Sequence, residues 1–99
     1  MQIQLTPWRD ALYDEGIGKA ALENLISRGL FPQPIVILTG KRGSQKYFPA
    51  NELEARRACL VAHEGNEDEL RELLARIQLE RGERARRALA LILKNEVAA

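Results

Sequence analysis

The segment RGLFPQPI, residues 28–35, strongly constrains how this chain can fold. Gly29 is a favourable end for a helix, and two prolines separated by one residue prevent a helix from continuing beyond it. The apolar and largely β-branched run IVIL follows at residues 35–38 and predicts a strand. The chain must therefore change from helix to strand within these few residues.

Two short helices are predicted before this segment. Thr6 suits an N-cap and Pro7 the first helical position, while Gly16 suits the left-handed end of the same helix. A second helix is predicted over residues 19–28. Its buried face is expected to consist of Ala21, Leu22, Leu25 and Ile26. Two short helices joined by Gly-Ile-Gly make a helix-turn-helix.

A basic β-hairpin is predicted after it. The turn segment TGKRGS contains two glycines, and residues 45–48 can return as the partner strand. The net charge of the chain is only +1, but no acidic residue lies between Glu23 and Glu52. Three of the four cations in that interval lie in the hairpin loop. A local positive patch on a nearly neutral protein suits phosphate contacts, although chance clustering in a solvated loop is an alternative.

The second half of the chain is predicted to be helical. Pro49 opens a helix in which Asn51 and Glu54 resemble a capping box, with Leu53, Leu60 and Val61 on its core side. Asn66 and Glu69 repeat the cap pattern before an amphipathic stretch over residues 67–94. That stretch is expected to form a homodimer through one apolar stripe. The stripe consists of Leu70, Leu73, Leu74, Ile77, Ala85, Leu89 and Ile92.

Gly82 leaves two arrangements open for this stretch, because glycine disfavours a helix interior by about 1 kcal/mol relative to alanine. Either one long helix continues through Gly82, or two helices fold back there. In both cases the expected organisation is a DNA-binding domain over residues 1–63 and a helical oligomerisation segment over residues 66–99. The fold class is mostly α with a small β-hairpin.

Several classes of protein are disfavoured by the residue content. Cys59 and His63 are the single cysteine and histidine, and two ligands are too few for a structural zinc site. TGKRGS lacks the Lys-Ser/Thr that a phosphate-binding P-loop requires, and no nucleophile-base arrangement is visible. We expect no enzymatic activity, metal or cofactor. The N-terminus shows no signal-peptide pattern and no run approaches membrane-spanning length, so a soluble cytoplasmic protein is expected.

The segment GIGKAALENLISRGLF resembles the helix-turn-helix of the MerR superfamily. Gly16 falls at the turn glycine, Leu22 at the buried leucine of the second helix, and Gly29-Leu30 at its close. RGLFPQPI resembles the AlpA and excisionase branch, small regulators of phages and prophages. Tyr47 and the segment PANELEARR also fit that pattern, so the resemblance covers about residues 5–63.

The resemblance implies a winged helix-turn-helix followed by a C-terminal amphipathic helix or helix pair. Members of that superfamily place the second helix in the major groove of DNA and the wing along the backbone, and MerR proteins dimerise through a C-terminal helix. This sequence departs from the pattern at Ala20 and Glu23, where arginines are common, and at Asn24, where an aromatic residue is common. The residues expected to contact DNA are Lys19, Ala20, Glu23, Asn24, Ser27, Arg28, Lys41, Arg42, Ser44, Gln45 and Lys46.

These residue types suggest different contacts. Asn24 can read adenine with two hydrogen bonds, Glu23 can accept a hydrogen bond from cytosine N4, and Lys19 can meet a phosphate. The predicted function is that of a transcription regulator or an excisionase-type recombination factor. Two alternatives remain open at this point: the DNA-recognition subunit of a phage packaging machine, and a protein-interaction module on a winged-helix scaffold.

Overall fold

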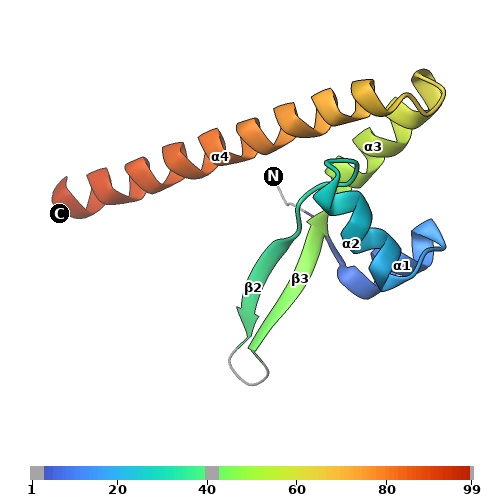
Figure 1. The fold of residues 1–99 in the computed structure, drawn as a ribbon. Helices are drawn as coiled ribbons and strands as arrows, with labels where there is room; N and C mark the ends of the chain where they lie inside the picture. Colours follow the sequence, from blue (N-terminus) through green and yellow to red (C-terminus); the bar gives the residue numbers. More distant parts are fainter. Residues whose placement is uncertain (1–3, 40–42, 99) are drawn as a thin grey trace.

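The computed structural model describes residues 4–39 and 43–98, which form four helices and a small three-stranded antiparallel sheet (Figure 1). The elements are β1 (Leu5–Pro7), α1 (Trp8–Glu15), α2 (Lys19–Ser27), β2 (Ile35–Thr39), β3 (Gly43–Pro49), α3 (Ala50–Ala62) and α4 (Glu67–Ala98). The mostly helical fold with a β-hairpin is confirmed. The molecule is elongated, about 52 × 33 × 23 Å, because α4 extends well beyond the rest of the chain.

The sheet has the strand order β1-β3-β2. Strands β2 and β3 form the expected hairpin, with Ile35 opposite Tyr47. Strand β1 adds a third strand, which pairs with β3 in antiparallel orientation. Because Thr6 pairs with Phe48 in this strand, it is not the N-cap of the first helix. Helix α1 begins at Trp8 with Pro7 as its N-cap, and no side chain caps it.

The glycine signals and one of the two cap patterns are confirmed. Gly16 and Gly29 adopt the left-handed conformation, with φ of 65° and 73°, at the ends of the first two helices. Asn66 Oδ1 accepts a hydrogen bond of 3.1 Å from the Glu69 backbone N–H, which satisfies a donor at the start of α4. The box predicted at Asn51 is wrong, because α3 already begins at Ala50 and has no side-chain cap.

The main core lies between the sheet and helices α1, α2 and α3. Its buried members are Ala11, Leu22, Phe31, Phe48 and Leu53. The rings of Phe31 and Phe48 meet edge to face with centroids 5.1 Å apart, and Trp8 stacks on Phe48 at 5.5 Å. Leu22 and Leu53 were expected in the core. Ala21 and Val61 were also expected there, but both are exposed, since no element covers their sides of α2 and α3.

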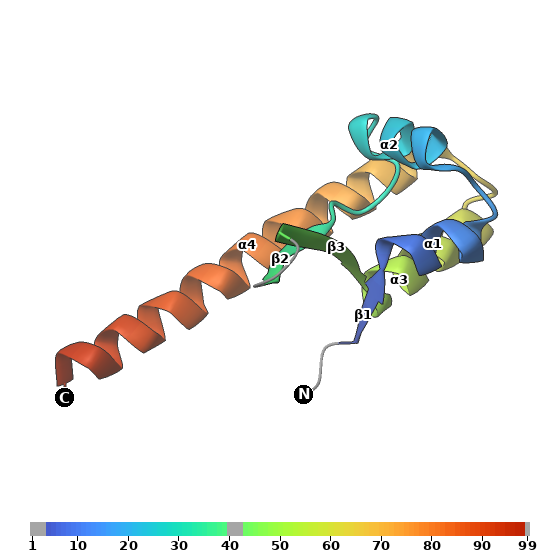
Figure 2. The ribbon, with the colours of Figure 1, turned by 90° about the horizontal axis from the view of Figure 1, so that it is seen from below.

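Helix α4 runs through Gly82 without a break, so the one-helix arrangement is correct (Figure 2). Its first half packs against α3 and the end of α2, where Leu70 and Leu74 are buried with Leu30 and Cys59. Leu73 and Ile77 pack against the same cluster. These four α4 side chains were expected in a dimer interface. That assignment is corrected for Leu70 and Leu74, which are buried within their own chain, whereas Leu73 and Ile77 are partly buried there.

Two arginines of different helices, the buried Arg56 and the partly buried Arg81, hold the helices together. Arg56 on α3 is 7% exposed, and its Nε donates to the Leu30 carbonyl at 2.9 Å. Its guanidinium lies 4.7 Å from the centre of the Phe31 ring and pairs with Glu15 at 3.4 Å. Burial lowers the pKa of Arg56, an effect that Glu15 opposes and the neighbouring Arg57 reinforces. Arginine nevertheless stays charged in proteins, so this group stabilises the junction of α1, α3 and the chain after α2.

Arg81 forms a second buried pair. It donates from both Nε and Nη2 to the carboxylate of Glu52, and from Nη2 to the Gln33 carbonyl at 3.0 Å. The Glu52 side chain is only 4% exposed. In the sequence, Arg81 is a charged residue between the apolar residues Ile77 and Ala85 of the α4 stripe. In the structure, it joins α4 to the start of α3 and to the chain before β2.

Candidate nucleic-acid interface

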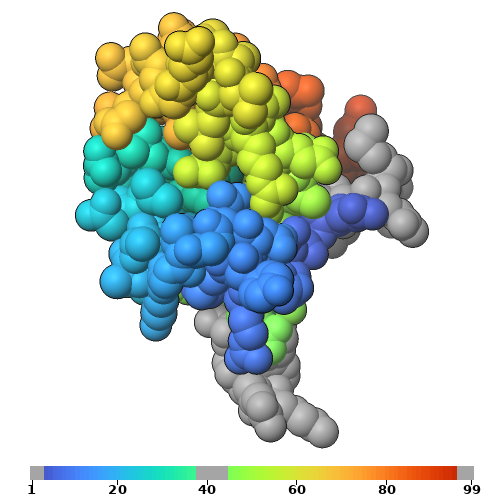
Figure 3. All heavy atoms as spheres, turned by 90° about the vertical axis from the view of Figure 1, so that its right-hand side faces the viewer, coloured from blue at the N-terminus to red at the C-terminus, as the bar shows by residue number. Residues whose placement is uncertain are grey.

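Helix α2 presents a solvent-exposed face that contains every residue expected to contact DNA from this helix. These residues are Lys19, Ala20, Glu23, Asn24, Ser27 and Arg28, and each is exposed. Leu22, on the opposite face, is fully buried and anchors the helix in the core. The surfaces of α1 and α2 adjoin below the turn that joins α3 to α4 (Figure 3). The core therefore holds α2 with its polar face toward solvent.

The first turns of α2 carry groups suited to base and phosphate contacts. Lys19 Nζ lies 4.0 Å from a carboxylate oxygen of Glu23, and both side chains are largely exposed. Such a pair contributes at most a few tenths of a kcal/mol, so either side chain can leave it for another partner. The Ser27 hydroxyl donates to the Asn24 backbone carbonyl at 2.9 Å, and the Asn24 side chain is exposed.

Arg28, at the C-terminal end of α2, has an intramolecular role. Its Nη2 donates to both carboxylate oxygens of Glu67 on α4, at 3.1 and 3.2 Å. Its backbone carbonyl accepts a hydrogen bond of 3.0 Å from Arg71 Nε. These contacts hold the end of α2 against α4. A phosphate contact by Arg28 would require the Glu67 pair to break, so we assign this residue to the α2–α4 junction.

The hairpin brings further predicted residues to the same part of the molecule. Lys46 Nζ lies 5.0 Å from the centre of the Trp8 ring, and Gln45 Oε1 accepts a hydrogen bond of 2.6 Å from the Tyr47 hydroxyl. Ser44 belongs to β3, but its side chain lies outside the part that the structure describes. Lys41 and Arg42 also lie outside the described residues, so their assignment rests on the sequence.

A hollow of about 490 Å³, which no sequence pattern indicated, lies where the start of α1 meets β3. It is lined by Pro7, Trp8, Arg9, Asp10, Gln45 and Lys46. The pairing of Pro7 with Tyr47 brings these two segments together. No local pattern predicts that long-range pairing, so Trp8 and Arg9 were not among the expected site residues.

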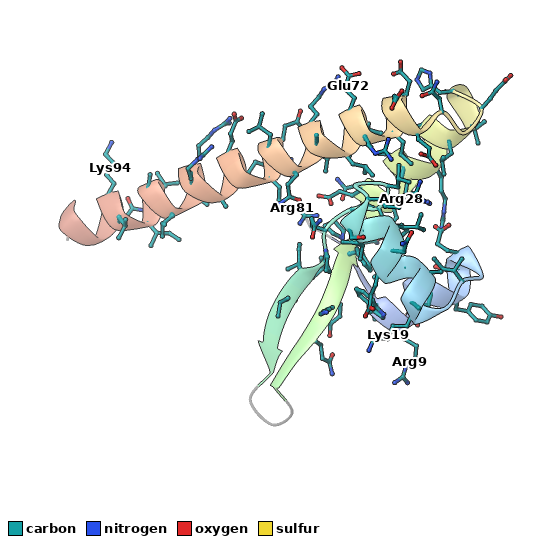
Figure 4. The ribbon with its side chains drawn as sticks, in the orientation of Figure 1. Arg9, Lys19, Arg28, Glu72, Arg81 and Lys94 are labelled. Carbon is teal, nitrogen blue, oxygen red and sulfur yellow. The ribbon has the colours of Figure 1, made fainter. Side chains whose placement is uncertain are left out.

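The cationic side chains of this region share one side of the molecule. Arg9 and Lys19 point away from α4, toward the side to which the hairpin projects, whereas Arg28 lies beside α4 (Figure 4). Lys46 lies on β3 next to Trp8. Lys19 at the start of α2, Arg9 and the strand-borne Lys46 therefore lie away from the long helix α4.

The remaining polar groups give no sign of a metal centre. Cys59 is buried in the second cluster, and His63 is the C-cap residue of α3. Within residues 4–39 and 43–98, no three histidine, cysteine or acidic side chains lie close enough to hold a metal ion. None of the helices described by the structure is both long and apolar enough to cross a bilayer.

No protein-family model, curated protein or solved structure matches this chain.

Proposed function

We propose that this chain is a small sequence-specific DNA-binding protein with a winged helix-turn-helix architecture. In this proposal α1 and α2 are the helix-turn-helix, α2 enters the major groove, and the β2–β3 hairpin lies along the DNA backbone. The observation that carries it is that α2 has an exposed polar face whose first residue, Lys19, lies on the same side of the molecule as the hairpin and Arg9. An α-helix fits the major groove, where base edges are distinguishable.

The described residues suggest a division of roles on the DNA. Asn24 and Glu23 occupy the middle of α2 and carry the groups that distinguish bases. Lys19 at the start of α2, together with Arg9 and Lys46 around the hollow, supplies positive charge for phosphates. Phosphate contacts fix the orientation of the protein, and base contacts provide the sequence preference.

A regulatory or architectural role on DNA follows from this reading. A transcription regulator and an excisionase-type recombination factor of a phage or mobile element would use the same surface.

The first experiment measures fluorescence anisotropy of labelled duplexes, one from the upstream region of the gene and one of random sequence, across a salt series. A steep salt dependence with preference for the upstream duplex supports the proposal, and no binding at low salt would contradict it.

Replacing Lys41, Arg42 and Lys46 together by alanine is expected to weaken binding to every duplex. Each lost phosphate contact reduces the magnitude of the slope of log K against log salt by about 0.9, so the loss of three contacts reduces it by about 2.7. Anisotropy titrations between about 50 and 200 mM salt measure this slope. The matched control replaces Arg76, Arg87 and Lys94, three exposed cations of α4, and should leave the slope nearly unchanged. Equal slopes for the two triple variants would show that the hairpin does not contact the DNA phosphates.

Replacing Asn24 by alanine should relax sequence preference rather than weaken all binding. The loss of a bidentate contact to a base is worth about 1–3 kcal/mol of discrimination, which is roughly a 5- to 150-fold change. Competition between specific and random duplexes at one salt concentration measures the ratio of affinities. Ala21→Ser, at an exposed position of α2 outside the expected DNA contacts, is the control for a general disturbance of the helix. A ratio that stays unchanged in Asn24→Ala would exclude Asn24 as a base-reading residue.

One observation favours a second candidate function, a protein-interaction module. On α2, Glu23 offsets Lys19, and Glu67 holds Arg28, so this face offers hydrogen-bonding groups with little net positive charge. A protein partner suits such a face better than a polyanion does. Absence of DNA binding by an otherwise folded protein would favour this reading.

A further inference from the structure

The last turns of α4 lie outside the packed part of the molecule. The helix projects away from the core, and every side chain from Arg84 to Asn95 is exposed (Figure 2). Four large apolar side chains of this segment are between 52% and 62% exposed, namely Leu89, Leu91, Ile92 and Leu93. A free helix of this length is only marginally stable in water, and clustered apolar exposure is typical of an interaction surface.

The charge of α4 changes sign at the start of the same segment. Residues 67–83 contain six acidic and three basic residues, whereas residues 84–95 contain four basic residues and no acidic one. The four cations are Arg84, Arg86, Arg87 and Lys94. Arg87 pairs with Glu83 at 3.5 Å, but its side chain is largely exposed, so water screens this pair. The projecting segment is therefore a cationic helix that also carries large apolar side chains.

The apolar and cationic residues occupy separate sides of this segment. Successive side chains of an α-helix are rotated by about 100° around its axis. Over residues 85–94, the apolar arc contains Ala85, Ala88, Leu89, Leu91, Ile92 and Leu93, and the cationic arc contains Arg86, Arg87, Ala90 and Lys94. The apolar arc is about 200° wide, and no charged residue interrupts it.

An apolar arc of this width exceeds what one partner helix covers. A helix on a protein core commonly presents an apolar stripe about 100° wide, and the seam of a coiled coil is narrower. Ala85, Leu89 and Ile92 were expected to face a second copy. Leu91 and Leu93, at the two edges of the arc, would stay exposed in such a pair. A lipid bilayer offers a continuous apolar phase that accepts the whole arc, with lysine and arginine at the level of the headgroups.

We propose that residues 84–95 of α4 bind the surface of an anionic lipid bilayer. The helix lies in the plane of the membrane, with its apolar arc at the boundary between headgroups and acyl chains. Arg86, Arg87 and Lys94 then face the lipid phosphates. Charge complementarity carries the choice of lipid, because four cations without an acid are attracted to anionic headgroups. A nucleic acid would also attract the cations, but it offers no apolar phase for the leucines.

The inference does not depend on the proposed DNA binding, because it uses a different part of the chain. Co-sedimentation of the full chain with lipid vesicles tests the dependence on charge. The chain should bind vesicles made of equal parts of phosphatidylcholine and phosphatidylglycerol, and it should bind phosphatidylcholine alone only weakly. Equal binding to the two kinds of vesicle, or no binding to either at low salt, overturns the proposal.

Removal of two cations of the segment measures their contribution. Each cation near an anionic surface is worth about a fivefold change in partitioning, so Arg86→Gln with Lys94→Gln should lower it by about 30-fold. The matched control is Arg57→Gln with Arg76→Gln, which removes two exposed cations outside the segment and should leave partitioning nearly unchanged. Circular dichroism verifies that both variants remain folded. An equal loss in the two variants overturns the assignment to this segment.

Removal of apolar side chains measures the contribution of the apolar arc. Each methylene buried in a membrane contributes about a fourfold change in affinity, so Leu89→Ala with Ile92→Ala should lower vesicle binding on the order of 100-fold. Val61→Ala is the control, because Val61 is 82% exposed but lies on α3. Unchanged binding of the double variant would show that the attraction is electrostatic only, which contradicts insertion of the arc.

Two fluorescent labels test the orientation of the helix on the membrane. In a Cys59→Ala background, an environment-sensitive dye is attached to Leu89→Cys on the apolar arc or to Arg87→Cys on the cationic arc. On anionic vesicles, the emission of the first label should shift to shorter wavelength, and that of the second should change little. Equal shifts of both labels overturn the orientation. A Leu89 label that is already in an apolar environment without vesicles overturns the proposal and indicates a second copy or another protein on this arc.

Discussion

Replacement of Arg81 by methionine is expected to lower the free energy of unfolding by about 3–5 kcal/mol. The variant leaves the carboxylate of Glu52, whose side chain is 4% exposed, without its cationic partner. It also removes the donor to the Gln33 carbonyl. A buried charge without a partner is strongly destabilising, even where the intact pair adds little net stability. Urea denaturation at fixed protein concentration, followed by circular dichroism, measures the change.

A matched control is Arg87→Met on the same helix. Arg87 pairs with Glu83 at 3.5 Å, but its side chain is 78% exposed, and a surface pair of this type contributes only a few tenths of a kcal/mol. Pairing Arg81→Met with Glu52→Leu should recover much of the loss, because the orphaned charge is then gone. Equal unfolding midpoints for Arg81→Met and Arg87→Met would contradict the assignment of Arg81 as a buried tie between α4 and the core.

The second large effect is expected at Phe48. This side chain is completely buried in β3 between the rings of Trp8 and Phe31. Phe48→Ala should destabilise the fold by about 3–5 kcal/mol, since it removes buried apolar surface and leaves a cavity. It also withdraws the surface on which Trp8 stacks, and Trp8 in turn lies under Lys46. DNA affinity should therefore fall even where the variant is still folded.

Unfolding followed by the fluorescence of Trp8, the single tryptophan, measures this loss at the affected site. Val36→Ala is the control within the sheet, because Val36 is 53% exposed on β2. Its effect should be within about 1 kcal/mol, as for most surface substitutions. A comparable loss in the two variants would show that the Trp8–Phe48–Phe31 stack is not the centre of the core.

Local signals in the sequence determined several of the element boundaries, whereas the helix starts expected from Thr6 and Asn51 were wrong. Gly16 and Gly29 end two helices because a left-handed backbone strains residues with a Cβ, and Asn66 caps α4 with its own side chain. The prolines before Ile35 separate α2 from the hairpin. In each case the signal and the structure that it specifies lie within a few residues, so the sequence alone sufficed.

Only the tertiary structure decided which surfaces meet. Arg81 and Glu52 lie 29 residues apart, and no local pattern shows that they pair or that Glu52 becomes buried. The pairing of β1 with β3, which creates the hollow beside Trp8, is equally long-range. Apolar periodicity revealed that α4 has a buried face, but it merged the residues facing the core with those facing solvent. The reason is physical: a repeat fixes which residues share a side of a helix, whereas the neighbour that covers them comes from the packing of distant segments.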